Sequence, residues 1–200
     1  TLGQVVTGRR RVRWTSTVFH MEQVGLDAVP IVALLTFLVG AVVAFVGATA
    51  LREFGAEIFT VELVSISFLR EFGVLLTAIL IAGRSGSAFT AQIGSMKSRE
   101  ELDAIQALGL DAIELLVIPR LLALFVMLPL LTFIAMMMGI VGGGIVGTLA
   151  LDITPGMFIS RVQEMTGVEH FWVGMVKAPV FAFLIATVGC LEGFKVEGSA

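Results

Sequence analysis

The chain has 200 residues, of which 57% are hydrophobic and 14% are charged, and its mean hydropathy is +0.99. Counting the 22 glycines, which are 11% of the chain, raises the apolar share to 68%, against roughly 45–50% in soluble chains. This composition excludes an ordinary soluble domain and predicts an integral membrane protein. The 13 basic and 16 acidic residues are too balanced to predict nucleic acid or an anionic surface as the main partner.

Four apolar runs are long enough to cross a bilayer core of about 30 Å, which takes about 20 helical residues. They cover residues 29–50, 63–82, 121–151 and 171–191. Their continuity predicts helices, because a transmembrane barrel would show short segments of alternating polarity. We therefore predict an all-α polytopic transmembrane bundle, with Pro129 as a candidate kink in the long third run. We treat 1–200 as one domain. It comprises an N-terminal cytoplasmic or interfacial segment (1–28), a membrane region (29–191) and a cytoplasmic tail (192–200).

The basic residues predict how these spans are oriented. They gather before the first span, between the second and third, and after the fourth: Arg9, Arg10, Arg11, Arg13, Arg84, Lys97, Arg99, Arg120 and Lys195. Only Arg52 and Arg161 lie in the other two connections. By the positive-inside rule, the N-terminus, the loop 84–120 and the tail face the cytoplasm. Residues 15–26 fit an interfacial entry helix and a solvated linker equally well.

Small residues at four-residue spacing predict where helices touch. The repeats are Gly40, Ala44 and Ala48 in the first span and Gly139, Gly143 and Gly147 in the third. Such faces let two helix backbones approach closely, so we assign them to packing.

Three charges lie inside the apolar runs: Arg70 and Glu71 in the second and Lys177 in the fourth. Each costs about 2.5–3.5 kcal/mol in lipid even on the mildest scale. Arg70 and Glu71 are about 100° apart on a helix and should not face each other well. At about 1.5 Å per residue, Glu71 and Lys177 lie at similar depths, which allows a contact between them. An ion pair that fixes packing and a role in substrate passage are equally good interpretations.

The loop 84–120 contains a predicted amphipathic helix. Residues 98–101 fit a capping box, Leu102, Ile105 and Leu108 form an apolar stripe, and Gly109 is a stop signal. A second capping pattern, Asp111 to Glu114, should start the helix that enters the third span. The short helix would suit docking to another protein, although a solvated surface helix is the commoner meaning of such a pattern.

Catalytic and metal chemistry find little support in the sequence. Residues 83–86 fit the GxSG pattern of intramembrane serine proteases, with His170 as the nominal base, but topology places Ser85 about 30 Å from it. Cys190, His20 and His170 have no companions at metal-ligand spacing. No Walker A motif occurs, so ATP-driven work would need a second polypeptide. We predict neither catalytic nor metal-binding residues in this chain.

Four segments of the sequence form distinctive motifs: Phe68-Leu-Arg-Glu-Phe-Gly, Ala82-Gly-Arg-Ser-Gly-Ser-Ala-Phe-Thr-Ala-Gln-Ile-Gly-Ser-Met, Glu101-Leu-Asp-Ala-Ile-Gln-Ala-Leu-Gly-Leu-Asp and Pro119-Arg120. Together they resemble the MlaE (YrbE) permease family. The resemblance implies the permease subunit of an MCE-type lipid ABC transporter, homodimeric in the bacterial inner membrane. The implied partners are a cytoplasmic ATPase carrying ATP and Mg, a periplasmic MCE-domain protein, phospholipid and, often, a small STAS-domain protein.

The resemblance also implies roles for individual residues. Residues 94–109 would form the helix that couples to the ATPase, with Met96, Arg99, Glu101, Leu102, Asp103, Ile105, Leu108 and Gly109. Arg70, Glu71 and Lys177 match charges near the lipid path, and our choices for the cavity wall are Leu38, Val42, Leu69 and Leu76. Val74 departs from the family, which often has proline there. The family's final helix would follow residues 193–194, so five spans are expected in the complete subunit, and we expect a chain that opens on Thr1 to be a fragment.

We therefore predict an ATP-driven permease that moves phospholipid between the inner and outer membranes, with its own N-terminus cytoplasmic and no catalysis in this chain. An ion-coupled secondary transporter that uses the three intramembrane charges is the main alternative. The serine protease remains a distant third.

Overall fold

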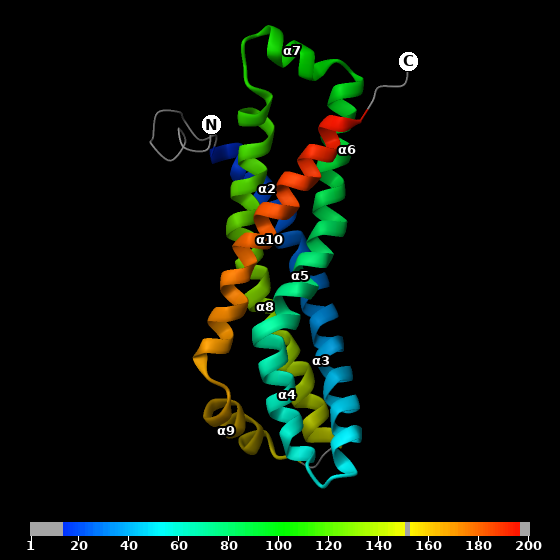
Figure 1. Ribbon diagram of the computed structural model, residues 1–200, viewed down its shortest axis with the longest axis vertical. Coiled ribbons are helices and arrows are strands. Elements are labelled where there is room, and N and C mark those ends of the chain that lie inside the picture. Colours follow the sequence, from blue (N-terminus) through cyan, green and yellow to red (C-terminus); the bar gives the residue numbers. More distant parts are fainter. Residues whose placement is uncertain (1–13, 151–152, 197–200) are drawn as a thin grey trace. The chain divides into compact units, whose positions relative to one another are not determined.

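The structure is a computed structural model that describes residues 14–150 and 153–196, and every regular element in these ranges is helical (Figure 1). The labelled helices are α2 (Trp14–Val24), α3 (Val29–Arg52), α4 (Thr60–Ser67), α5 (Gly73–Ile81), α6 (Ser87–Ser98), α7 (Glu101–Ala107), α8 (Ile118–Ala150), α9 (Pro155–Met165) and α10 (Val168–Lys195). Short 3₁₀ segments cover Leu26–Ala28 and Glu57–Phe59, and π-helical segments cover Phe68–Phe72, Ala82–Gly86 and Ile113–Val117. The predicted all-α fold is confirmed.

Four helical stretches in the described residues are long and apolar enough to cross a membrane. They run over Thr15–Arg52, Glu57–Ser98, Ile113–Ala150 and Val168–Lys195. The four predicted spans are therefore confirmed, but each continues beyond its apolar run. The largest difference concerns the second span, which stays helical through the π-helical segment Ala82–Gly86 to Ser98. The predicted loop 84–120 was wrong at its start, because hydropathy reports contact with lipid, whereas the less apolar stretch 83–98 contains no proline and can continue a helix.

Residues 14–24 form the helix α2, so the linker interpretation of this segment was wrong. One face of α2 is buried at Thr17 and Val24, whereas Val18 and Phe19 on the other face are exposed. Gly25, just after α2, lies so close to Met127 that a Cβ atom there would clash with the methionine side chain. The arginine cluster at 9–13 lies outside the described residues.

The chain divides into two compact units. Unit 1 comprises residues 1–27, 80–127 and 179–200, and unit 2 comprises residues 28–79 and 128–178. Two of the four divisions fall beside Pro129 and at Pro179, inside α8 and α10. We describe each unit by itself.

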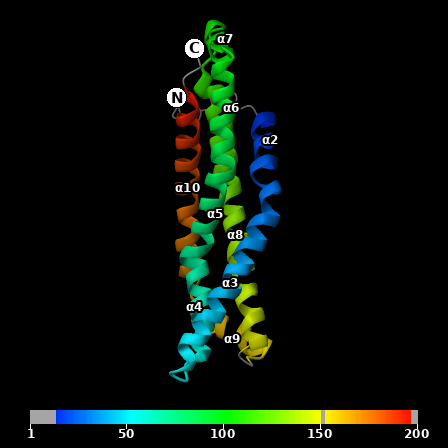
Figure 2. The same ribbon diagram turned by 90° about the vertical axis from the view of Figure 1, so that its right-hand side faces the viewer.

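Unit 2 is built around a glycine contact between α3 and α8, the two helices that carry the predicted small-residue faces. A Cβ atom at Gly40 would lie 2.0 Å from the carbonyl oxygen of Gly139, and one at Gly142 would lie 2.1 Å from the carbonyl oxygen of Phe37. The two backbones therefore touch directly. Beside this contact Ala44, Val64 and Phe68 form a buried cluster, and α4 lies alongside α3 in both views (Figures 1 and 2). The packing role of the small residues is confirmed.

Helix α9 in unit 2 was not predicted. Thr154 caps it, since its hydroxyl oxygen accepts a hydrogen bond from the Met157 amide at 3.3 Å, and Pro155 occupies the first turn. Phe158 turns inward and, with Val61 and Ile153, forms a second buried cluster. A threonine followed by proline is a helix-start signal, so this element could have been found from the sequence.

Unit 1 joins α6 to the last turns of α10, which lie side by side (Figure 2). The Thr90 hydroxyl donates to the Gly189 carbonyl at 2.8 Å, and the Lys97 ammonium donates to the Phe194 carbonyl at 2.7 Å. Gly193 makes room for Ile93, whose side chain would lie 2.7 Å from a Cβ atom there. The predicted tail thus begins as part of a packed helix that ends at Lys195.

The Asp111 cap predicted from the sequence is present, because the Asp111 carboxylate accepts a hydrogen bond from the Ile113 amide at 2.9 Å. We expect Asp111→Ala to lower the free energy of unfolding by about 1 kcal/mol, the usual loss for a missing cap. Asp111→Asn is the matched control and should remain close to the native chain, because asparagine caps equally well. Thermal unfolding in detergent measures both, and equal losses in the two variants would contradict the capping role.

Candidate functional site

The segment between α6 and α8 carries the residues assigned to ATPase coupling. Among its described residues, the segment contains one α-helix, α7, which is seven residues long, and the π-helical segment Ile113–Val117. The capping box predicted at residues 98–101 was wrong. Ser98 ends α6, where its hydroxyl bonds to the Gly94 carbonyl, and Glu100 precedes α7 with φ +60° and no side-chain cap. Ser98 fails as a cap because its own helix continues up to it and satisfies its hydroxyl.

The end of α7 follows the prediction. Gly109 has φ +72°, and the amides of Gly109 and Leu110 bond back to the carbonyls of Gln106 and Ile105. This is a Schellman arrangement, which glycine adopts without strain. The stop signal at Gly109 is confirmed.

The predicted apolar stripe of α7 divides in the structure. Leu102 is buried, Ile105 is half-buried and Leu108 is 76% exposed. Leu102 therefore packs α7 against the rest of unit 1, whereas the Leu108 side chain remains available to contact another protein. Leu110 and Ile113 are exposed just beyond it, so the segment presents apolar side chains that no described residue of unit 1 covers.

The remaining coupling residues surround this apolar surface. Glu101 and Asp103 are exposed on the first turn of α7, and Arg99 lies 4.0 Å from the Glu101 carboxylate. Met96 lies in α6 and Arg99 follows it, so these two precede α7. The predicted single coupling helix over 94–109 is thus a helix end, a turn and a short helix.

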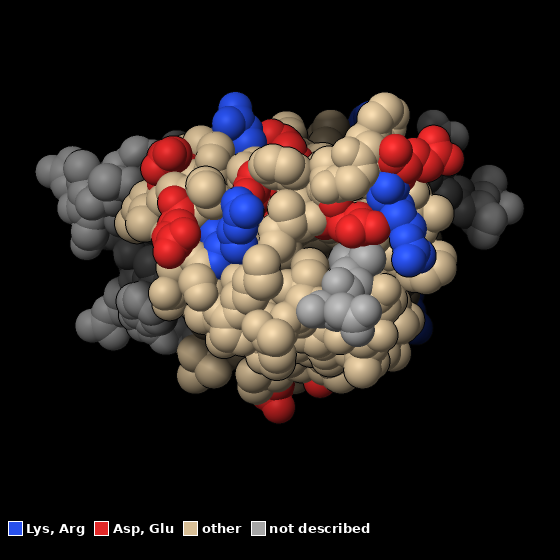
Figure 3. Space-filling model, turned by 90° about the horizontal axis from the view of Figure 1, so that it is seen from below, with Lys and Arg blue, Asp and Glu red and all other residues tan. Residues whose placement is uncertain are grey.

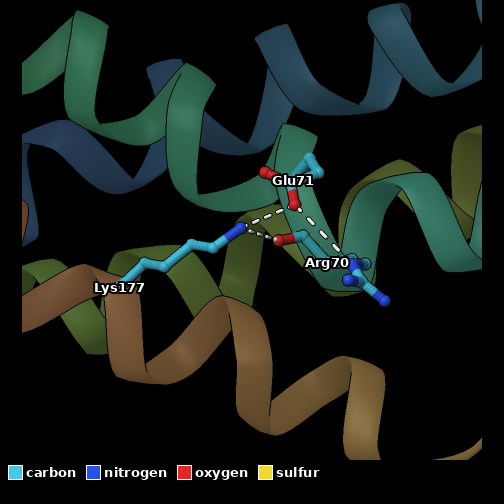
Figure 4. A network of polar contacts seen from close by, with 3 residues as sticks. All are labelled: Arg70, Glu71 and Lys177. Atoms are coloured by element: carbon cyan, nitrogen blue, oxygen red, sulfur yellow. Dashed lines mark hydrogen bonds and ion pairs between the residues drawn. The ribbon is translucent and has the colours of Figure 1, made fainter.

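The intramembrane charges meet in unit 2 (Figure 4). The Lys177 ammonium donates to the Glu71 carboxylate at 2.6 Å and to the Arg70 carbonyl at 3.2 Å. The Glu71–Lys177 contact that the helix depths allowed is present. The Arg70 guanidinium also lies 3.7 Å from the same Glu71 carboxylate, so the prediction that Arg70 and Glu71 do not face each other was wrong.

Local backbone geometry explains this network. Residues 68–72 form a π-helical segment, closed by a bond from the Gly73 amide to the Phe68 carbonyl. A π segment rotates successive side chains differently from an α-helix and is frequent at functional sites. On α10, Gly174 admits the neighbouring backbone, because a Cβ atom there would lie 2.2 Å from the Leu69 carbonyl oxygen. Close contact at Gly174 brings Lys177, one turn later, to Glu71.

The network of Arg70, Glu71 and Lys177 is partly exposed on the surface of unit 2. The side chains of Arg70, Glu71 and Lys177 are 51%, 45% and 35% exposed. Charged groups at membrane depth face a bundle interior or a water-filled cavity instead of lipid tails. This face of unit 2 therefore requires a polar environment.

The four residues chosen for the cavity wall are not brought together. Leu38 and Val42 lie one turn apart on the exposed face of α3. Leu69 is buried, and Leu76 packs against the cluster of Ala44, Val64 and Phe68. The last two therefore serve packing within unit 2.

The end of unit 2 that carries α9 displays acidic and basic side chains among uncharged ones (Figure 3). Arg161 donates to Glu62 at 2.8 Å, with both side chains largely buried, and Arg52 lies 3.4 Å from Glu57. Arg161 also lies over the Phe59 ring. The sequence carried no signal for the pair of Arg161 and Glu62, because 99 residues separate them.

The protease motif lies within a helix. Ser85 belongs to the π-helical segment Ala82–Gly86 and is buried in unit 1, whereas His170 belongs to unit 2. Neither unit by itself therefore contains a serine–histidine pair from this motif.

The fold and these sites define a polytopic helical membrane protein with charges inside its membrane region and an exposed short helix between two spans. The family model described as Permease MlaE matches residues 17–200. The chain belongs to the MlaE permease family.

Curated relatives agree with this assignment. A probable ABC transporter permease of Synechocystis is 35% identical over 190 residues, covering 95% of this chain and 72% of the relative. A probable ABC transporter permease of Rickettsia bellii is 34% identical, covering 86% of this chain and 66% of the relative. The Haemophilus influenzae protein named intermembrane phospholipid transport system permease protein MlaE is 33% identical, covering 88% of this chain and 67% of its own length.

Proposed function

We propose that this chain is the permease subunit of an ATP-driven transporter that moves phospholipid between the inner and outer membranes. The observation that carries the proposal is the family match over residues 17–200, within which the Haemophilus relative is named a phospholipid transport permease. The intramembrane charges add a physical argument, because they require a polar path or chamber at membrane depth. A phospholipid headgroup crossing a bilayer requires the same environment.

ATP and Mg are bound, in this proposal, by a separate cytoplasmic ATPase, since the chain has no Walker A motif. The segment around α7 is the proposed docking surface. Its exposed Leu108 and Leu110 offer an apolar contact, and the carboxylates of Glu101 and Asp103 flank it. An apolar centre with a charged rim is the usual composition of a protein interface.

Reversing the charge of α7 tests the docking surface. We expect Glu101→Lys combined with Asp103→Lys to release the ATPase, because the rim would then repel the basic groups it now attracts. Co-purification should fall about tenfold or more, which corresponds to about 1.4 kcal/mol, while the permease stays folded because both side chains are exposed.

The matched control is Glu164→Lys, which reverses an exposed carboxylate on α9 in unit 2. This variant should retain the ATPase. An unchanged complex in the double variant on α7 would contradict the docking assignment.

We further propose that the subunit works as a homodimer in the bacterial inner membrane. The exposed face with Arg70, Glu71 and Lys177 would then line a chamber shared with the second copy. A periplasmic MCE-domain protein would bind on the side opposite the ATPase, and a STAS-domain protein would join on the cytoplasmic side.

The distribution of charge supports a cytoplasmic N-terminus. Unit 1 contains 9 of the 13 basic residues, and the four in unit 2 all form ion pairs with carboxylates. Basic residues are therefore concentrated in unit 1, which contains residues 1–27 and the α7 segment, and this bias favours the cytoplasmic side for them.

Affinity purification of the full-length subunit from native membranes, with mass spectrometry of proteins and lipids, tests the proposal. We expect an ATPase, an MCE-domain protein and phospholipid to co-purify, and lipid transfer between vesicles to require ATP hydrolysis. The charge network also suits an ion-coupled secondary transporter. Transport that is driven by an ion gradient and survives loss of the ATPase would replace our proposal with that alternative.

A further inference from the structure

Arg120 differs from every other arginine that the structure describes. Five of these six arginines have a carboxylate oxygen within 4.0 Å. Arg120 has none among the described residues, although it is only 4% exposed. A buried guanidinium without a counter-ion is costly, because desolvation of the charge is not offset.

The groups around Arg120 satisfy it only in part. One terminal nitrogen donates to the Gln92 side-chain oxygen at 3.0 Å, and the other makes a long bond of 3.4 Å to the Leu116 carbonyl. The Phe89 ring covers one side of the guanidinium at 5.4 Å. The Nε atom is buried and has no hydrogen-bond partner in the part of the chain that the structure describes.

The nearby titratable groups do not supply the missing anion. His20 and Cys190 are close enough to interact electrostatically with Arg120, but neither is a carboxylate. Among the described residues, the groups that compensate the charge are therefore dipoles, the Cys190 thiol among them, and an aromatic ring.

A groove of about 450 Å³ opens on this group in unit 1. It is lined by Ala91, Gln92, Ser95 and Met96 of α6 and by Arg120 of α8. Because the Gln92 oxygen accepts from Arg120, its amide nitrogen is left as a donor. The groove thus combines a fixed cation, an amide donor and the Ser95 hydroxyl with the apolar flanks of Ala91 and Met96.

We propose that this groove binds the phosphate group of a phospholipid, with the Arg120 guanidinium as the principal ligand. A planar guanidinium pairs with phosphate oxygens through two parallel hydrogen bonds. The lipid source is favoured over free phosphate because α6 and α8 both belong to stretches apolar enough to span a membrane, and because apolar side chains flank the cation. This inference rests on the proposed phospholipid transporter and names a headgroup subsite for it.

The substitution Gln92→Glu tests the site without removing Arg120. It places a carboxylate where the Gln92 oxygen now lies, 3.0 Å from the guanidinium, so the arginine gains an internal counter-ion that competes with phosphate. We expect retention of phosphatidylglycerol by the purified full-length subunit in neutral detergent to fall about tenfold. Thermal stability should stay level or rise. Native mass spectrometry with added phosphatidylglycerol measures retention, and diacylglycerol, which lacks phosphate, should bind equally to both forms.

Two further variants keep the test decisive. Arg120→Lys retains the charge but loses the planar fork and should also weaken retention of phosphatidylglycerol. Arg84→Gln removes an exposed arginine of the same unit, paired with Asp27 at 3.7 Å, and should leave retention unchanged. Undiminished retention in Gln92→Glu would overturn the site and make Arg120 a packing residue.

Inorganic phosphate distinguishes the two sources of the anion. The thermal stability of the subunit is measured with inorganic phosphate and with phosphatidylglycerol. The lipid assignment is overturned if inorganic phosphate stabilises the native subunit as strongly as phosphatidylglycerol does and fails to stabilise Gln92→Glu. Retention is measured without ATP, so it separates this site from the proposed function. A subunit that retains phosphatidylglycerol through Arg120 but fails to transport it would refute the function and keep the site.

Discussion

Glu71→Gln is expected to reduce ATP-dependent lipid transport about tenfold or more while the complex still assembles. The substitution preserves the shape of the side chain but removes the charge that faces both Lys177 and Arg70. Breaking a fully buried ion pair costs about 3–5 kcal/mol. Glu71 and Lys177 are 45% and 35% exposed, so we expect only about 1–2 kcal/mol of lost stability here. The transport rate should fall by more than this loss of stability explains, because Arg70 and Lys177 would then lie on the exposed face without a neutralising carboxylate.

Two further variants distinguish a role of Glu71 in lipid passage from a role in helix packing. Combining Glu71→Gln with Lys177→Gln removes the unpaired ammonium, so stability should recover while transport stays low. Glu62→Gln is the matched control, because it breaks the 2.8 Å pair with Arg161 in the same unit. That variant should lose stability and keep its transport rate per folded complex. If Glu71→Gln behaves like Glu62→Gln, the intramembrane network serves packing alone.

Gly40→Ala is expected to destabilise the protein by about 1–3 kcal/mol, the usual cost of overpacking. The added methyl group would lie 2.0 Å from the Gly139 carbonyl oxygen and 2.9 Å from its Cα atom. Both are backbone atoms, so no side chain can move aside and α3 must separate from α8. Reversible unfolding of the purified protein in detergent measures the loss.

Gly156→Ala provides the control for the glycine contact. Gly156 lies in the first turn of α9, in the same unit, and nothing lies within 4 Å of a Cβ atom there. Alanine should be neutral or stabilise this helix by up to about 1 kcal/mol, because glycine has the poorer helix propensity. Equal stability of the two variants would show that α3 and α8 do not meet at Gly40.

The sequence revealed local features well. Runs of about 20 apolar residues identified four spans, the Gly40 and Gly139 repeats identified two helix faces suited to close contact, and Asp111 and Gly109 marked a helix start and a stop. Predictions from the sequence were wrong where one local pattern is compatible with two structures. Ser98 fits a cap but ends the preceding helix, and the polar stretch after Ala82 resembles a loop but stays helical.

The amino-acid sequence by itself determined the all-α membrane fold, the family and the identity of the intramembrane charges, because hydropathy, spacing and motifs are properties of adjacent residues. Only the tertiary structure decided which charges are paired. Glu71 meets Lys177 across 106 positions, Glu62 meets Arg161 across 99, and Arg120 meets Gln92 across 28 without gaining a carboxylate. Such partners are set by helix packing and by π-helical turns that rotate side chains out of α-helical register. Sequence periodicity can mark a packing face, but it does not record which side chains meet across two helices or where a π-helical turn falls.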